Sequence, residues 1–130
     1  MSLSLLRATI RPDVTSDMGH HNFSYMIYPH ENGAVEAGVN KLAFQFNEQL
    51  VKSDVLYDGD TFEPLYLQAM KDSEDGSMTV IRLSEQDGKR GKIKLSKSVK
   101  LLDMLENVIG EAVDTLEYKP FEIITIGIQK

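Results

Sequence analysis

The chain of 130 residues contains no cysteine and no tryptophan. Without cysteine it can form neither a disulfide framework nor a thiolate metal site, and it has no thiol nucleophile. This absence fits a reducing compartment, so we expect a cytoplasmic protein. No apolar run approaches the roughly 20 residues that a membrane helix needs. No basic segment precedes the leucines near the start, as a secretory signal would require.

Basic side chains are outnumbered by acidic ones, 14 against 20, which gives a formal charge of -6. Binding to nucleic acid depends on lysine and arginine neutralising phosphates, and anionic membranes attract basic segments in the same way. Neither partner is therefore expected. Hydrophobic residues make up 42% and charged residues 26%, which is ordinary globular composition. The length is that of one domain, so we predict a single β-rich domain over residues 1–130.

Alternating apolar residues predict a mainly β fold. The predicted extended segments are residues 3–10, 22–28, 62–70, 78–83, 91–95 and 121–128. Residues 22–28 are apolar on both faces, which is typical of a strand covered on two sides. In residues 62–70, Leu65, Leu67 and Ala69 are expected to share one face. The turn Gln86-Asp87-Gly88 predicts a hairpin between its two flanking strands.

One segment follows a helical period instead. Val35, Val39, Leu42 and Phe46 recur every three or four residues, which predicts an amphipathic helix over residues 34–51, with Lys41 and Gln45 facing out. Residues 99–113 fit either a helix or a strand. The lysines and arginine of residues 89–100 fit either a basic groove or, as we favour, the polar face that protects an edge strand.

Chemistry-bearing residues form no strong motif. His20, His21 and His30 with Asp17 would be the candidates for a metal site, but neighbours on an extended segment point to opposite faces, and the HExxH spacing is absent. We favour hydrogen-bonded structural histidines and predict no metal site. A glycosidase needs two carboxyl groups facing each other across about 5–10 Å, which spacing alone cannot reveal. We therefore predict no catalytic residue.

Three stretches, in the same order along the chain, carry a family resemblance. Met78–Glu85 resembles a "v-v-l-R-l-y-E" strand, and Lys119–Thr125 resembles a closing "P-F-E-I-x-T" strand. The matching positions of the first stretch are Leu5, Leu6, Arg7, Pro12, Asp13, Asp17, Gly19, His21, Phe23, Tyr25, Tyr28, Pro29 and His30. By these residues the chain resembles the C-terminal β region of bacterial α-mannosidases of glycoside hydrolase family 38.

The resemblance implies an antiparallel β-sandwich, supersandwich-like, within a much larger multidomain glycosidase, and extended structure in residues 99–113. The parent enzyme would hydrolyse terminal α-mannosides of mannose-containing oligosaccharides with retention, using zinc in an upstream α/β domain. This chain would hold no cofactor. It would pack on the parent's catalytic and helical domains and line the rim of the cleft, for which Arg7, Asp17 and His21 are the candidates. The abrupt start at a strand-like segment fits a piece of a longer chain.

Two alternatives stay open at this point. Strand aromatics and acidic loops would also suit a stand-alone carbohydrate-binding module, and the lack of a strong site would suit a small interaction domain. Apart from its parent, such a chain would expose apolar surface, so we expect a homodimer or marginal stability.

Overall fold

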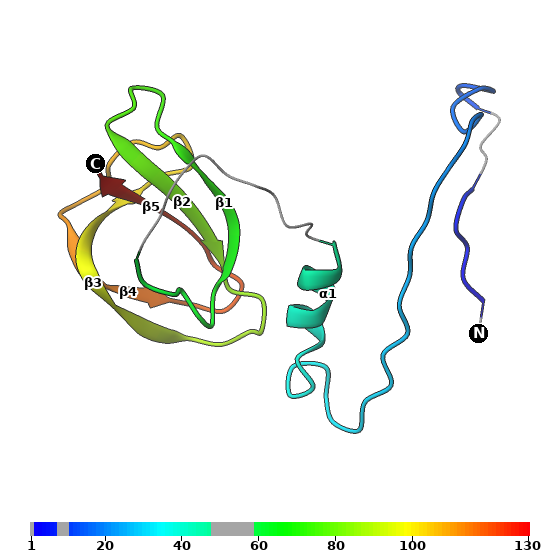
Figure 1. Ribbon diagram of the computed structural model, residues 1–130, viewed down its shortest axis with the longest axis horizontal. Helices are drawn as coiled ribbons and strands as arrows, with labels where there is room; N and C mark the ends of the chain where they lie inside the picture. The colour runs from blue at the N-terminus through cyan, green and yellow to red at the C-terminus, as the bar shows by residue number, and fades with distance from the viewer. Residues whose placement is uncertain (1, 8–10, 48–58) are drawn as a thin grey trace. The chain divides into compact units, whose positions relative to one another are not determined.

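The computed structural model describes residues 2–7, 11–47 and 59–130, and the chain divides into two compact units, Met1–Glu31 and Asn32–Lys130 (Figure 1). The regular elements all belong to the second unit: α1 (Val39–Asn47), β1 (Tyr66–Asp72), β2 (Met78–Ser84), β3 (Gly91–Leu102), β4 (Val113–Tyr118) and β5 (Ile123–Gln129). No helix in the described ranges is long and apolar enough to cross a membrane. A single domain over residues 1–130 stays a prediction.

The five strands form one antiparallel sheet in the order β1-β2-β5-β3-β4. The mainly β fold with one helix is therefore confirmed. β3 is the longest strand, and it pairs with different neighbours along its length. Its first part pairs with β4 and its last part with β5, with a shift of register between Lys94 and Val99. Figure 1 shows β3 curving, which brings β4 round toward the face of β2 and β5.

This curvature closes the sheet around one apolar core. Ile81 of β2 lies opposite Ile126 of β5, and Leu83 lies opposite Ile124. The core cluster consists of Leu65, Ile81, Leu83, Leu95, Val99, Leu116, Tyr118, Ile124 and Ile126. Each fully buried aliphatic side chain of this kind stabilises the fold by about 1.5–3 kcal/mol relative to its exposure. The core therefore depends on β2, β3, β4 and β5 together.

Gly91, at the start of β3, is required by its neighbour across the strand pair. Gly91 faces Tyr118 of β4, and a Cβ added at Gly91 would lie 2.4 Å from the Tyr118 hydroxyl oxygen. The Tyr118 ring is itself buried. Any larger residue at Gly91 would push this ring out of the core.

The predicted hairpin between β2 and β3 is wrong, although both strands exist. β2 already has β1 on one side and β5 on the other, so no edge of β2 is left for β3. The Asp-Gly turn is present, and Gly88 adopts a φ of 73°, as such turns require. The turn therefore redirects the chain to a new position in the sheet instead of folding it back on β2.

The predicted helix is confirmed in part. α1 begins at Val39, and residues 34–38 form turns, because Gly38 adopts a φ of 67° that an α-helix cannot contain. The predicted last turn falls partly on residues 48–51, which lie outside the described residues. Lys41 and Gln45 are exposed, as predicted, and both also line a cleft beside β1.

The face assigned to residues 62–70 is also wrong. β1 carries a bulge between Leu67 and Ala69, and both residues are exposed, whereas Leu65 is buried just before the strand. Leu65 precedes β1, which begins at Tyr66, so its burial does not extend to Leu67 and Ala69 within the strand.

Residues 99–113 do not form a helix. They contain extended structure, as the resemblance implied. Val99–Leu102 ends β3, and the loop that follows is held by the carboxylate of Asp103, whose Oδ1 accepts the backbone N–H of Leu105 (2.8 Å) and of Asn107 (2.9 Å). β4 then begins at Val113, and the sequence analysis did not predict this strand. The final strand is confirmed, although it begins at Ile123 and not at Phe121.

The two strands predicted in the first unit are absent from its described residues. Residues 2–7 and 22–28 form no strand, and residues 8–10 lie outside the described residues. In residues 22–28 the large apolar side chains are exposed, including Tyr25 at 63% and Ile27 at 73%. A strand is stable only beside a hydrogen-bonded neighbour. The sequence pattern is that of a strand, but the described part of the chain offers no partner for it.

Candidate functional site

The predicted rim residues lie in the first unit. Arg7 is exposed in the irregular segment 2–7, and Asp17 and His21 lie together at the end of a turn, where His21 Nε2 is 3.1 Å from the backbone oxygen of Asp17. Asp13 orders the turn, because its Oδ1 accepts both the backbone N–H and the hydroxyl of Thr15 at 2.8 Å. These hydrogen bonds also lower the pKa of Asp13. The structure thus brings together Asp17 and His21 of the three candidates.

The described residues do not fit a zinc site. No group of three or more histidine, cysteine or acidic side chains among them is placed to hold a metal ion. His21 directs Nε2 at the backbone oxygen of Asp17, 3.1 Å away, so this nitrogen is already engaged within the turn. The described residues therefore include no candidate set of zinc ligands.

The carboxylate of Glu85 accepts four backbone N–H groups. Its Oε1 accepts the backbone N–H of Asp87 (2.9 Å) and of Lys89 (3.0 Å), while Oε2 accepts that of Gly88 (2.9 Å) and of Phe121 (2.9 Å). The side chain is buried, with Glu85 only 4% exposed. Burial by itself would raise the pKa of Glu85, but the four N–H donors outweigh it and the pKa is lowered.

Glu85 connects two turns that are distant in sequence. One is the turn after β2, and the other is the turn before β5, where Phe121 adopts a φ of 59° that side chains rarely adopt. The backbone N–H of Glu85 also donates to the carbonyl oxygen of Glu122 (2.9 Å). The two stretches of family resemblance in this unit, ending in Arg82-Leu83-Ser84-Glu85 and beginning with Pro120-Phe121-Glu122, therefore meet in space. Their role here is to hold the sheet's connections.

Arg82, the other charged residue of that motif, also has a structural position. Its Nε donates to Thr125 Oγ1 of β5 at 3.2 Å, and Nη2 lies 3.4 Å from the carbonyl oxygen of Met104. The Met104 loop is further tied to β1 by an ion pair between Glu106 and Lys71 at 2.6 Å. Arg82 thus links β2, β5 and the loop after β3.

The basic residues of 89–100 support the edge-strand interpretation. Lys92 and Lys94 of β3 form ion pairs with Glu117 and Asp114 of β4, the outermost strand of the sheet. Two of the four lysines of β3 are thus compensated across the strand pair. The arrangement favours a solvated polar face over a basic groove.

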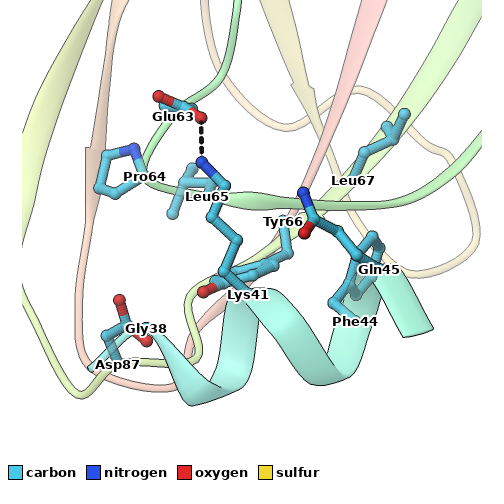
Figure 2. A pocket seen from close by; sticks show the side chains of 10 residues that line it. All are labelled: Gly38, Lys41, Phe44, Gln45, Glu63, Pro64, Leu65, Tyr66, Leu67 and Asp87. Atoms are coloured by element: carbon cyan, nitrogen blue, oxygen red, sulfur yellow. Dashed lines mark hydrogen bonds and ion pairs between the residues drawn. The ribbon is translucent and has the colours of Figure 1, made fainter. Parts of the chain in front are cut away.

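A cleft of about 390 Å³ lies between α1 and the chain entering β1 (Figure 2). α1 is joined to the sheet by Asn40, whose Nδ2 donates to the carbonyl oxygen of Gln86 (2.8 Å) and to Asp87 Oδ1 (3.1 Å). Figure 2 shows Lys41 reaching from α1 to Glu63, with Nζ and Oε1 2.8 Å apart. The cleft is lined by Gly38, Lys41, Phe44, Gln45, Glu63, Pro64, Leu65, Tyr66, Leu67 and Asp87.

The inner part of this cleft is aromatic, and its rim is polar. The rings of Phe44 and Tyr66 contact each other with centroids 5.5 Å apart and planes tilted by 58°. Burial raises the pKa of Tyr66, and the negative charge of Asp87 raises it further. The Lys41 and Glu63 pair is exposed and raises the pKa of Lys41 while lowering that of Glu63, mainly through their hydrogen bond. The cleft thus offers donors and acceptors beside aromatic surface.

The sequence does not reveal this cleft because its residues are not on the predicted apolar stripe. Asn40 and Phe44, four residues apart, define a second face of α1, and this face meets the sheet. The signal was the presence of Phe44 away from the stripe of Val39, Leu42 and Phe46. Which face docks was not deducible without knowing that Asp87 and Tyr66 lie nearby.

The five antiparallel strands and their shared core place the chain in the mainly β class of domains. A family model described as "Glycosyl hydrolases family 38 C-terminal beta sandwich domain" matches residues 64–126, which include β1 to β4 and part of β5. Over these residues, just under half of the chain, the protein is similar to that domain. No solved structure matches the chain at a significant level.

Relatives with curated descriptions are α-mannosidases. "Alpha-mannosidase G" of Dictyostelium discoideum is 30% identical over 96% of this chain and 14% of its own length. "Alpha-mannosidase" of Saccharomyces cerevisiae is 30% identical over 96% of this chain and 13% of its own length. "Alpha-mannosidase 2C1" of Mus musculus is 49% identical over 39% of this chain and 5% of its own length. The chain thus spans 5% to 14% of these relatives, and a bacterial origin stays a prediction.

Proposed function

We propose that this chain serves as the non-catalytic C-terminal β-sandwich domain of an α-mannosidase, packing on the catalytic and helical domains of a larger polypeptide. The observation that carries the proposal is the match of a family 38 C-terminal domain to the sheet, together with relatives named α-mannosidases in which the matched region is a small part. The parent would cleave terminal α-mannosides with retention in the cytoplasm. Its zinc would lie in the catalytic domain, outside this chain.

Exposed apolar side chains support the packing role. Large apolar residues in the first unit are exposed over a long stretch, and more lie exposed in the loop after β3 and at Phe121 and Ile123. Contiguous exposed apolar surface on a soluble protein is characteristic of an interaction site. Packing against neighbouring domains would cover it.

The rim of the cleft is the finer part of the proposal. The turn that holds Asp17 and His21 is ordered by Asp13. The imidazole ring of His21 stacks on the ring of Phe23, with centroids 6.1 Å apart. Arg7 offers a planar set of donors that suits paired oxygen acceptors. In the parent these three side chains would face the catalytic cleft.

Two measurements test the proposal. The purified chain is expected to give no turnover of an aryl α-mannoside, with or without added zinc, and measurable turnover would contradict its non-catalytic role. The genomic reading frame is expected to extend upstream into a catalytic domain. A reading frame confined to this chain would remove the parent enzyme from the proposal.

A further inference from the structure

We infer that the cleft between α1 and β1 binds one ring of a neutral hexopyranose. The inference goes beyond the proposed function, because it concerns the residues that line this cleft and does not depend on the parent's catalytic chemistry. It rests on the volume of the cleft, its aromatic inner surface and its polar rim.

The size and composition of the cleft suit a small ring. A volume of about 390 Å³ lies at the lower end of the roughly 300–1,000 Å³ typical of small-molecule sites. Phe44 and Tyr66 supply aromatic surface from two different elements, α1 and β1. The electron-rich faces of such rings attract the C–H groups of a sugar ring, which carry partial positive charge.

The rim favours a ligand with several hydroxyl groups. Lys41 is a donor, Glu63 is an acceptor, and the Gln45 amide is both. Lys41 and Glu63 are already paired at 2.8 Å but remain exposed, with side chains 59% and 75% accessible. Neighbouring hydroxyls of a sugar can donate to the carboxylate and accept from the ammonium at the same time.

The charges of the cleft disfavour an anion. Its lining contains one cation, Lys41, and two carboxylates, Glu63 and Asp87. Asp87 is satisfied by Asn40 at 3.1 Å and lies 3.8 Å from Lys89 Nζ, so its charge is compensated from outside the cleft. A neutral ligand introduces no uncompensated charge into this arrangement, which matters because burying an unpaired charge is costly.

The test is an NMR titration of the complete ¹⁵N-labelled chain with methyl α-D-mannopyranoside. We expect saturable shift changes at Lys41, Phe44 and Tyr66. Cyclohexanol, an apolar ring with a single hydroxyl, is the matched probe and is expected to bind more weakly. Absence of saturable changes at these residues, changes confined to the first unit, or equal binding of cyclohexanol would each overturn the inference.

Two variants separate binding from folding of the cleft. Phe44→Ala should weaken binding roughly twofold to tenfold through the loss of one aromatic contact. Because this change could also release α1, Lys41→Met provides a second variant that leaves the ring contact in place, and it should weaken binding as well. The Asn40 side-chain signals report whether α1 stays docked.

Lys94→Met is the matched control, since it removes an exposed ion pair of β3 and β4 instead of the one at the cleft. Its affinity for the sugar should equal that of the unchanged chain. Equal affinity in Lys41→Met and Lys94→Met would argue against the cleft. Failure of this titration leaves the proposed function untouched, because that function is tested by turnover and by the reading frame.

Discussion

The first unit and the sheet contain similar apolar alternation but very different burial. Tyr25 and Ile27 of the first unit are 63% and 73% exposed, whereas Ile81 and Ile126 of the sheet are fully buried. The sheet's side chains are covered because residues of β2 and β5 pack with residues of β3 and β4 in one core cluster. An apolar pattern therefore indicates what a segment is suited to contact, and burial depends on whether the contacting segment is present.

The largest expected effect on the free energy of unfolding is the difference between one isoleucine-to-alanine change in the sheet and the same change in the first unit. Ile126→Ala leaves a cavity in the core and should lower the free energy of unfolding by about 2–5 kcal/mol. Ile27→Ala removes an exposed side chain and should change it by less than about 0.5 kcal/mol. Urea unfolding followed by circular dichroism measures both. Equal losses would mean that the two regions do not differ in packing.

A smaller loss is expected at the carboxylate that joins the turns. Glu85→Gln removes the charge that accepts four N–H groups and should lower the unfolding free energy by about 2–3 kcal/mol. Glu117→Gln, on the exposed side of β4, is the matched control and should leave the urea midpoint nearly unchanged. If both variants unfolded at the same urea concentration, Glu85 would not be an anchor.

The pKa of Glu85 also predicts a dependence on pH. Because its folded pKa lies below the ordinary value of 4.5, its contribution is complete above that value and is lost as the pH falls through the folded pKa. Unfolding midpoints of the unchanged chain and of Glu85→Gln should therefore converge as the pH is lowered from 6 toward 3, roughly the range in which carboxylates titrate. A constant difference across this range would contradict the assignment.

A local effect is expected where α1 meets the sheet. Asn40→Ala removes two hydrogen bonds to the turn after β2 and should speed amide exchange in α1 roughly thirtyfold, since each such bond contributes about 1 kcal/mol. Asn47→Ala, which removes a bond within the helix to Ala43, is the control. It should not alter the signals of Gln86 and Asp87. Unchanged exchange in Asn40→Ala would mean that α1 is held by other contacts.

The smallest effect on stability is expected from replacing exposed aromatic residues of the first unit, a change that should instead alter self-association. Replacing Phe23 and Tyr25 by serine should leave the urea midpoint of the sheet unchanged, because both side chains are exposed. The same change should reduce self-association, measured by light scattering, if the first unit mediates the expected homodimer. A monodisperse monomer of the unchanged chain at high concentration would contradict that expectation.

The strands that were predicted correctly are those whose pattern and partners both lie in this chain. Met78–Ser84 and Ile123–Gln129 were recognised by their apolar runs, and their direct pairing explains why the pattern succeeded. β4 was missed because only Leu116 and Tyr118 mark its buried face. Gly38 was decisive for the start of α1, yet its effect depends on a backbone conformation that composition does not reveal.

The candidate cleft could not be predicted from the sequence for a related reason. Its residues come from three separated stretches, around Lys41, Tyr66 and Asp87, and each is unremarkable in its own stretch. Their meeting depends on the route that the chain takes from β2 to β3. The Glu85 anchor was visible as part of a family-like motif, but its contacts with the Phe121 turn required the sheet order.

The division of β3 between two partners has a consequence for how the sheet opens. Residues 91–94 belong to the ladder with β4, and residues 100–102 belong to the ladder with β5. Because one continuous segment serves both ladders, strain applied at β4 is transmitted along the backbone to β5. We therefore expect amide protons at the two ends of β3 to become exchangeable in a single concerted opening event.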